Sequence, residues 1–154
     1  MLGGLEVVWR EGGLADEEFE RRLFEEVRAA TWAALPLDPA QKRALIDQQH
    51  EARRRQYASS YPNAQHLVFS KDGEPVGALI LAESEHEILI VDVSVLPARQ
   101  GQGIGTAMLR SVIESTAKVL TLHVERSNPA LELYARLGFV EVADDGMVVT
   151  MQRR

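Results

Sequence analysis

Residues 95–106 read VLPARQGQGIGT and are the most informative stretch of the sequence. A run rich in β-branched residues, 88–96, is stopped by Pro97, and three glycines then fall within five positions before an amphipathic helix expected over 104–118. Glycines at such a place let the backbone approach a ligand closely and point successive N–H groups at it. The positive end of the helix dipole faces the same ligand. The stretch therefore predicts a phosphate or pyrophosphate site, and a tight turn without a ligand is the alternative.

Two common phosphate-binding motifs fit this stretch poorly. A P-loop needs Gly-Lys followed by Ser or Thr, which the sequence does not contain. A dinucleotide-binding motif counted from Gly101 needs a glycine at position 106, where Thr106 stands, although Glu125 lies at about the right distance to bind a ribose. Antiparallel pairing is expected before the loop, whereas a dinucleotide fold begins with βαβ units. Binding of NAD is therefore kept only as an alternative.

The rest of the sequence predicts a mixed α+β sheet domain. Asp72-Gly73 marks a hairpin, because this pair supplies the positive φ that a tight turn needs. The expected elements are strands at 5–9, 67–69, 76–82, 88–96, 119–124, 139–142 and 147–151, and helices at 16–34, 39–57, 104–118 and 129–137. We expect a single domain over residues 1–154, with a mostly antiparallel sheet of about seven strands and about four helices.

Composition excludes several classes of protein. The 154 residues, 45% of them hydrophobic and 26% charged, are typical of one folded core, and the net charge of −6 argues against a nucleic acid partner. The longest apolar run, 76–82, is too short for a membrane span, and the N-terminal sequence lacks a targeting signal. Without cysteine there is no disulfide and no thiolate metal site, and His50, His66 and His86 lack metal-ligand spacing. We expect a soluble, cytoplasmic protein without a metal.

The glycine-rich stretch resembles the acyl-CoA pyrophosphate motif of the GNAT superfamily of N-acetyltransferases. That motif has Gln or Arg, two residues, Gly, one residue, and Gly or Ala; residues 100–105 read QGQGIG here. A second family signature resembles residues 128–139, NPALELYARLGF. The resemblance covers the whole chain and is strongest from about residue 66 onward. It implies a GNAT fold and an enzyme that transfers an acetyl group from acetyl-CoA to a primary amine of a small molecule or peptide, by direct attack in a ternary complex.

The resemblance also implies positions for acetyl-CoA. Its pyrophosphate would bind the amides of the loop, and its pantetheine would pair with the preceding strand, where the fourth and fifth strands separate. An amide of that strand would polarise the thioester carbonyl. The expected cofactor contacts are Val93, Ser94, Val95, Gln100, Gly101, Gln102, Gly103, Ile104, Gly105, Thr106 and Asn128.

Tyr134 is the candidate general acid. In the family, the tyrosine of the second signature lies near the CoA sulfur, where a phenol can protonate the leaving thiolate. The alternative is that Tyr134 packs in the core, because it lies at helical spacing from Leu131 and Leu137. Asn128 is expected to cap the helix under either interpretation.

The general base is less clearly specified, and three residues are candidates. Asp92 interrupts the apolar run 88–96, and a buried carboxylate needs partners, so it is a candidate for amine recognition or base catalysis; a structural hydrogen-bonding role is the alternative. Glu87 stands where some family members place a catalytic glutamate and shares strand parity with Val93, although an exposed carboxylate in a turn is its alternative. His123 is a further candidate.

The acceptor is not specified by any motif. The expected helix over 39–57 has a thin apolar stripe, and its five basic and two acidic residues give it a charge of +3, so it is either a solvated surface or the lining of a binding site. The triplet Arg53-Arg54-Arg55 suggests an acceptor that carries a carboxylate or phosphate beside its amine. A non-catalytic acyl-CoA-binding module is the alternative function. Homodimers are common in the family, and a homodimer is one expected assembly.

Overall fold

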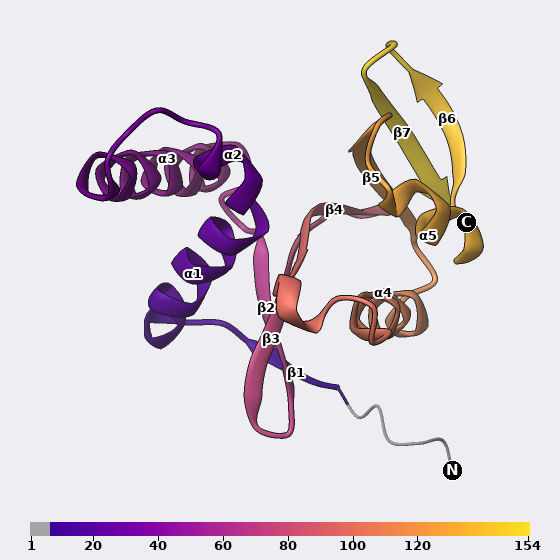
Figure 1. Ribbon diagram of the computed structural model, residues 1–154. Coiled ribbons are helices and arrows are strands. Elements are labelled where there is room, and N and C mark those ends of the chain that lie inside the picture. The colour runs from indigo at the N-terminus through magenta and orange to yellow at the C-terminus, as the bar shows by residue number, and fades with distance from the viewer. Residues whose placement is uncertain (1–6) are drawn as a thin grey trace.

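Seven strands form one sheet in the computed structural model, which describes residues 7–154 (Figure 1). The strand order is β1-β2-β3-β4-β5-β7-β6, and every neighbouring pair is antiparallel except β4 and β5. The strands are Val8–Glu11 (β1), Gln65–Lys71 (β2), Glu74–Glu83 (β3), Glu87–Val95 (β4), Val119–Glu125 (β5), Val140–Asp144 (β6) and Val148–Arg153 (β7). The predicted mixed, mostly antiparallel sheet is confirmed.

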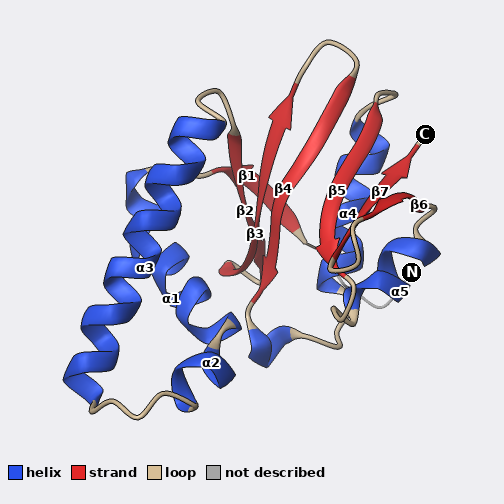
Figure 2. Ribbon diagram, turned by 90° about the horizontal axis from the view of Figure 1, so that it is seen from above, coloured by secondary structure: helices blue, strands red, loops and turns tan. Residues whose placement is uncertain are grey.

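Helices cover both faces of this sheet (Figure 2). α1, α2 and α3 lie on one side of β2 to β4, and α4 lies on the other. The helices are Glu17–Val27 (α1), Ala29–Ala33 (α2), Pro39–Ser60 (α3), Ile104–Ser115 (α4) and Ala130–Arg136 (α5). Within residues 7–154, no helix has both the length and the apolar character needed to cross a bilayer.

The single helix expected over 16–34 is in fact two helices, α1 and α2. The backbone leaves helical geometry at Arg28, with φ −105° and ψ 21°. The break is stabilised because side chains satisfy the last carbonyls of α1: Arg28 donates to Phe24 O at 3.3 Å, and Trp32 Nε1 donates to Glu25 O at 3.0 Å. Trp32 then packs on Phe24, with Ile46 of α3, in a small second core.

The other expected boundaries shift by up to three residues, most in three elements. The first strand, expected at 5–9, is observed at Val8–Glu11, and residues 5 and 6 lie outside the described part of the chain. The helix expected to end at Lys118 ends at Ser115, because the backbone becomes extended at Thr116, with φ −146° and ψ 151°. Lys118 Nζ then lies 2.6 Å from Glu83 Oε2. α3 continues three residues beyond the expected end at residue 57.

Several local signals are confirmed. Asp38 caps α3 by accepting from Gln41 N at 2.8 Å. Asp72 and Gly73 adopt φ values of 53° and 80°, which is the left-handed geometry of the predicted two-residue hairpin turn between β2 and β3. Asp16 precedes α1 as expected, but its carboxylate binds Arg10 at 2.7 Å, and Arg10 with the Gly13 amide lowers the pKa of Asp16 to about 2.

A β-bulge divides β4. Ile80 of β3 pairs with Asp92 and Leu81 pairs with Ile90, so Val91 is an extra residue on β4. Before the bulge, Ile88 and Ile90 of β4 are buried in the main core. Beyond the bulge, β4 no longer pairs with β5. The bulge therefore lies where the two halves of the sheet begin to separate.

The close approach of α4 to β3 requires glycine at position 77. A Cβ on Gly77 would lie 2.8 Å from Met108 Sδ and 2.8 Å from the carbonyl oxygen of Ser94. Since the Ser94 carbonyl oxygen belongs to the backbone, a side chain at position 77 cannot be accommodated by a rotamer change of its neighbours alone.

We predict that Gly77→Ala destabilises the protein by about 1–3 kcal/mol, because the added methyl group overpacks the contact between β3 and α4. Gly13→Ala is the matched control, since a Cβ at Gly13 meets nothing within 4 Å, and its stability should stay within about 0.5 kcal/mol of the wild type. Urea unfolding of the three proteins measures both values; equal stability of Gly77→Ala and wild type would contradict the prediction.

Candidate functional site

The sheet opens between β4 and β5. Their parallel pairing runs only from Glu87↔Val119 to Ile90↔Leu122. Beyond this point β4 continues along β3, with Val93 opposite Leu79, whereas β5 continues along β7. Among the described residues, the backbone of β4 from Asp92 onward has no strand partner on its β5 side. The N–H and C=O groups on that side make no ladder hydrogen bonds to another strand and are available to an extended ligand.

The glycine-rich loop places backbone amides beside this opening. Gly101 and Gly103 adopt φ values of 79° and 80°, a region that favours glycine. The first amide of α4 with a helical partner is that of Ala107, which donates to Gly103 O at 3.0 Å. The amides of residues 104–106 therefore point out of the helix N-terminus together with the positive end of its dipole. This arrangement suits an anionic group such as a pyrophosphate.

The remaining loop residues connect this helix terminus to β4. Gln100 Nε2 donates to Val95 O at 3.3 Å. Gly105 has space for a methyl group, because a Cβ there would lie 3.8 Å from Val95 Cγ2, an ordinary contact. That space agrees with a motif in which either glycine or alanine occupies this position.

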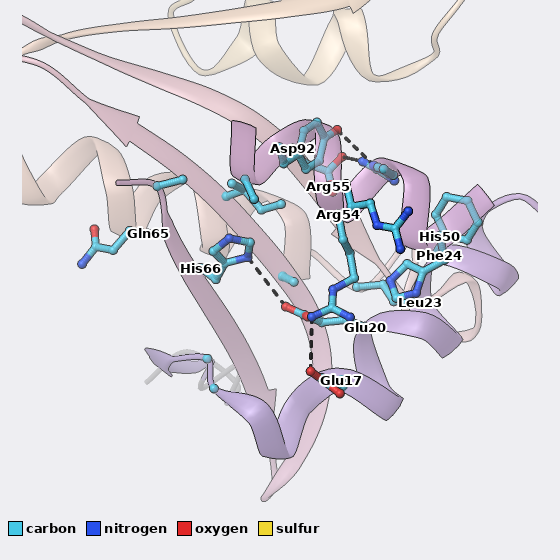
Figure 3. Close-up of a pocket in the computed structure, with 18 of the residues that line it drawn as sticks. Glu17, Glu20, Leu23, Phe24, His50, Arg54, Arg55, Gln65, His66 and Asp92 are labelled. Carbon is cyan, nitrogen blue, oxygen red and sulfur yellow. Dashed lines mark hydrogen bonds and ion pairs between the residues drawn. The ribbon is translucent and has the colours of Figure 1, made fainter. Parts of the chain in front are cut away.

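A cavity of about 680 Å³ lies on the opposite face of the sheet (Figure 3). Its walls include residues of α1 and α3, and its floor includes Ala78 and Ile80 of β3 and Asp92 of β4. The two helices are linked across it by Arg54 Nη2 and Glu17 Oε1 at 3.2 Å, as Figure 3 shows. A concave site of this volume is large enough for a small molecule or the end of a peptide.

The bulge in β4 turns Asp92 toward this cavity. With regular alternation Asp92 would share the face of Ile88 and Ile90, which are buried in the main core. The extra residue Val91 moves it to the face of its partner Ile80. There Asp92 Oδ1 lies 2.7 Å from Arg53 Nη2, and its side chain is 24% exposed. Asp92 thus has the partner that a half-buried carboxylate needs, and this partner is Arg53 of α3.

The expected strand parity between Glu87 and Val93 is wrong, because the bulge at Val91 lies between them. Val93 packs against the main core, whereas Glu87 lies at the start of β4, opposite Val119. Glu87 is not among the described residues that line the cavity. A catalytic role for Glu87 stays a prediction, and Asp92 is the carboxylate of β4 that reaches the cavity.

α3 lines the cavity with side chains at helical spacing, a pattern that sequence analysis missed. Ile46, His50, Arg53 and Tyr57 share one face of the helix, and the last three line the cavity. The spacing i, i+4, i+7, i+11 was visible in the sequence, but three of its four members are polar, so it does not resemble a core stripe.

The three arginines of residues 53–55 all form ion pairs within the protein. Arg53 pairs with Asp92, Arg54 pairs with Glu17 and Glu51, and Arg55 pairs with Glu51. Arg54 and Arg55 nevertheless stay 44% and 80% exposed, and each guanidinium keeps further N–H donors. The expectation that these arginines recognise a carboxylate or phosphate stays a prediction.

Tyr134 lies near Asp92 and also packs in the core. Its side chain is buried, and its ring meets Phe139 edge-on with the centroids 6.1 Å apart. Burial, and then the negative charge of Asp92, raise the pKa of the Tyr134 phenol. No hydrogen bond to its hydroxyl is formed within residues 7–154. Asn128 caps the same helix by accepting from Ala130 N at 2.9 Å, as expected.

The sequence profile of the Acetyltransferase (GNAT) family matches residues 24–139. The chain belongs to this family. Mycothiol acetyltransferase of Nocardia farcinica (strain IFM 10152) is 35% identical over 78 residues, which are 49% of this chain and 25% of that protein. A Bacillus subtilis (strain 168) protein provisionally named a ribosomal protein bS18-alanine N-acetyltransferase is 33% identical over 82 residues, 50% of this chain and 54% of that protein. These matches thus span from a quarter to about half of the relatives.

Solved structures support the GNAT fold over the whole chain. The PaiA N-acetyltransferase of Thermoplasma acidophilum, crystallised in complex with coenzyme A, has a TM-score of 0.73 at 16% identity. The match covers 97% of this chain and 99% of that chain. At this identity the comparison establishes the fold and says nothing of the acceptor.

Two further expectations concern His123 as a general base and the absence of a metal. His123 is exposed on β5, with Nδ1 3.0 Å from Thr150 Oγ1, and it does not line the cavity. Within residues 7–154, no three side chains of His, Cys, Asp or Glu come together as they would around a metal ion.

The electrostatic link between Asp92 and Tyr134 is testable by titration. We predict that Asp92→Asn lowers the pKa of Tyr134, because it removes a negative charge that disfavours the phenolate. The pKa should remain above about 10, the usual value for tyrosine, because burial is the larger cause. Absorbance of the phenolate between neutral and alkaline pH measures this shift, and Tyr134→Phe identifies the signal. An unchanged titration in Asp92→Asn would contradict the link.

Proposed function

We propose that this GNAT family member is an N-acetyltransferase that transfers an acetyl group from acetyl-CoA to a primary amine by direct attack in a ternary complex. The observation that carries the proposal is the opening between β4 and β5 beside the amides of the α4 N-terminus. The unpaired edge of β4 can hold an extended pantetheine, and the amides can hold the pyrophosphate.

The contacts to acetyl-CoA follow from this arrangement. Val93, Ser94 and Val95 supply the strand edge, and residues 100–106 supply the amide-rich loop. Asn128, at the start of α5, adds a polar contact. Coenzyme A bound to the PaiA structure of the same fold supports acetyl-CoA as the co-substrate.

The reaction needs no covalent enzyme intermediate. The neutral amine enters from the cavity between α1 and α3 and attacks the thioester carbon, and a C–N bond forms. A β4 amide donates to the developing oxyanion, a contact worth about 2.7–4 kcal/mol of barrier in comparable sites. The C–S bond then breaks, and Tyr134 protonates the leaving thiolate to give CoA. Asp92 binds the amine and takes up the proton that it loses.

The acceptor is a primary amine of a small molecule or of a peptide. The two relatives support one acceptor class each: one is named a mycothiol acetyltransferase, for a small molecule, and the other a ribosomal protein alanine N-acetyltransferase, for a polypeptide. The cavity is wide enough for either acceptor.

The remaining parts of the proposal concern the whole protein. We propose that residues 1–154 act as a single N-acetyltransferase domain in the cytoplasm, an assignment that the absence of cysteine supports. Assembly as a homodimer is part of the same proposal, and light scattering after size-exclusion chromatography would measure it.

Tyr134→Phe separates an enzyme from the alternative, a non-catalytic acyl-CoA-binding module. We predict that this variant transfers acetyl groups at least about tenfold more slowly, because it cannot protonate the thiolate. Its thermal stabilisation by CoA should match that of the wild type, which at about 100 times Kd gains about 2.7 kcal/mol. NAD should stabilise neither protein.

Tyr61→Phe is the matched control, because Tyr61 does not line the cavity, and its rate should equal that of the wild type. Stabilisation by CoA without acetyl transfer to any amine would favour the binding module. Stabilisation by NAD and not by CoA would contradict the family-based cofactor.

A further inference from the structure

Arg53 extends a charged side chain from α3 into the interior of the protein. Only 19% of this side chain is exposed. Burial of a guanidinium is unfavourable unless partners compensate for the lost hydration. Arg53 has three kinds of partner: Asp92, the hydroxyl of Tyr57, to which Nε donates at 3.0 Å, and the rings of Tyr57 and Phe24, whose centroids lie 5.0 and 5.7 Å away. These contacts fix the position of the guanidinium.

Both carboxylate oxygens of Asp92 have a partner. Oδ1 lies 2.7 Å from Arg53 Nη2, and Oδ2 accepts from Ser94 Oγ at 3.1 Å. A carboxylate has about four lone-pair sites, so these contacts leave room for another donor. The cavity borders Asp92, which remains 24% exposed. The carboxylate is therefore oriented and still accessible from the acceptor side.

The charged and titratable groups around Asp92 come from three directions. α3 contributes Arg53 and Tyr57, the junction between α1 and α2 contributes Arg28, and α5 contributes Tyr134. The guanidinium of Arg28 stacks on Phe24, 4.2 Å from the ring centroid. The guanidinium groups of Arg28 and Arg53 thus both act electrostatically on the Asp92 carboxylate. The same cations favour the neutral form of an amine nearby, and only the neutral amine can attack a thioester.

We propose that Arg53 is a positioning residue for acetyl transfer: it keeps the Asp92 carboxylate directed at the cavity, where the carboxylate receives the acceptor amine. This inference rests on the proposed function. It makes α3, which carries neither of the two GNAT signatures at residues 100–105 and 128–139, part of the apparatus that prepares the acceptor. Arg53 acts through Asp92 and does not itself touch the reacting atoms.

A double-mutant cycle tests this role. Arg53→Gln should lower kcat/KM for the acceptor at least about tenfold, since one charge-assisted contact is lost, and should leave Kd for CoA unchanged. In an Asp92→Asn background, Arg53→Gln should have no further effect on kcat/KM.

Two variants on the same helix complete the design. Arg53→Lys keeps the charge that pairs with Asp92, so it should recover part of kcat/KM for the acceptor even where Arg53→Gln is poorly folded. Arg43→Gln removes an exposed arginine of α3 that does not line the cavity, and its kinetics should equal those of the wild type.

The outcomes separate this inference from the function on which it rests. Independent effects of Arg53→Gln and Asp92→Asn, or no recovery of kcat/KM in Arg53→Lys, would overturn the role of Arg53 while leaving the acetyltransferase intact. A wild-type protein that acetylates no primary amine would overturn the proposed function and this inference together.

Discussion

The site depends on one constraint in the sheet, namely that β4 cannot pair along its whole length with β5. Four residue pairs join the two strands, and a bulge at Val91 follows. Beyond it, β4 belongs to the half of the sheet made by β1 to β4, and β5 belongs to the half made with β6 and β7. A sheet that stayed closed here would bury its backbone groups in ladder hydrogen bonds and leave none for a ligand.

The opening brings together groups that an intact sheet would keep on opposite faces. The amides of the α4 N-terminus lie on one face, and the cavity between α1 and α3 lies on the other. Asp92 faces the cavity, yet its charge acts on Tyr134 of α5, which packs in the main core. A cofactor on one side and an amine on the other can therefore meet at the gap, and positioning of the two reactants supplies a large part of the catalysis in such sites.

The sequence predicted the fold well where the local chemistry is distinctive. Asp72-Gly73, Asp38-Pro39 and the glycine-rich loop each require a particular backbone geometry, and the structure has it. The bulge at Val91 could not be predicted, because the residues from Ile88 to Val95 are apolar apart from Asp92 and Ser94, so a shift in register leaves apolar side chains on both faces. The burial of Arg53 was equally hidden, since it depends on a partner 39 positions away in the chain.

Backbone amide chemical shifts during a titration with CoA test the central claim most directly, because they report where the ligand binds without requiring an acceptor. The account predicts the largest changes at the loop of residues 100–106 and along β4 at Val93 and Val95, with smaller changes on the cavity side of α3. Changes confined to the cavity between α1 and α3, or none at all, would contradict a cofactor site at the opening between β4 and β5.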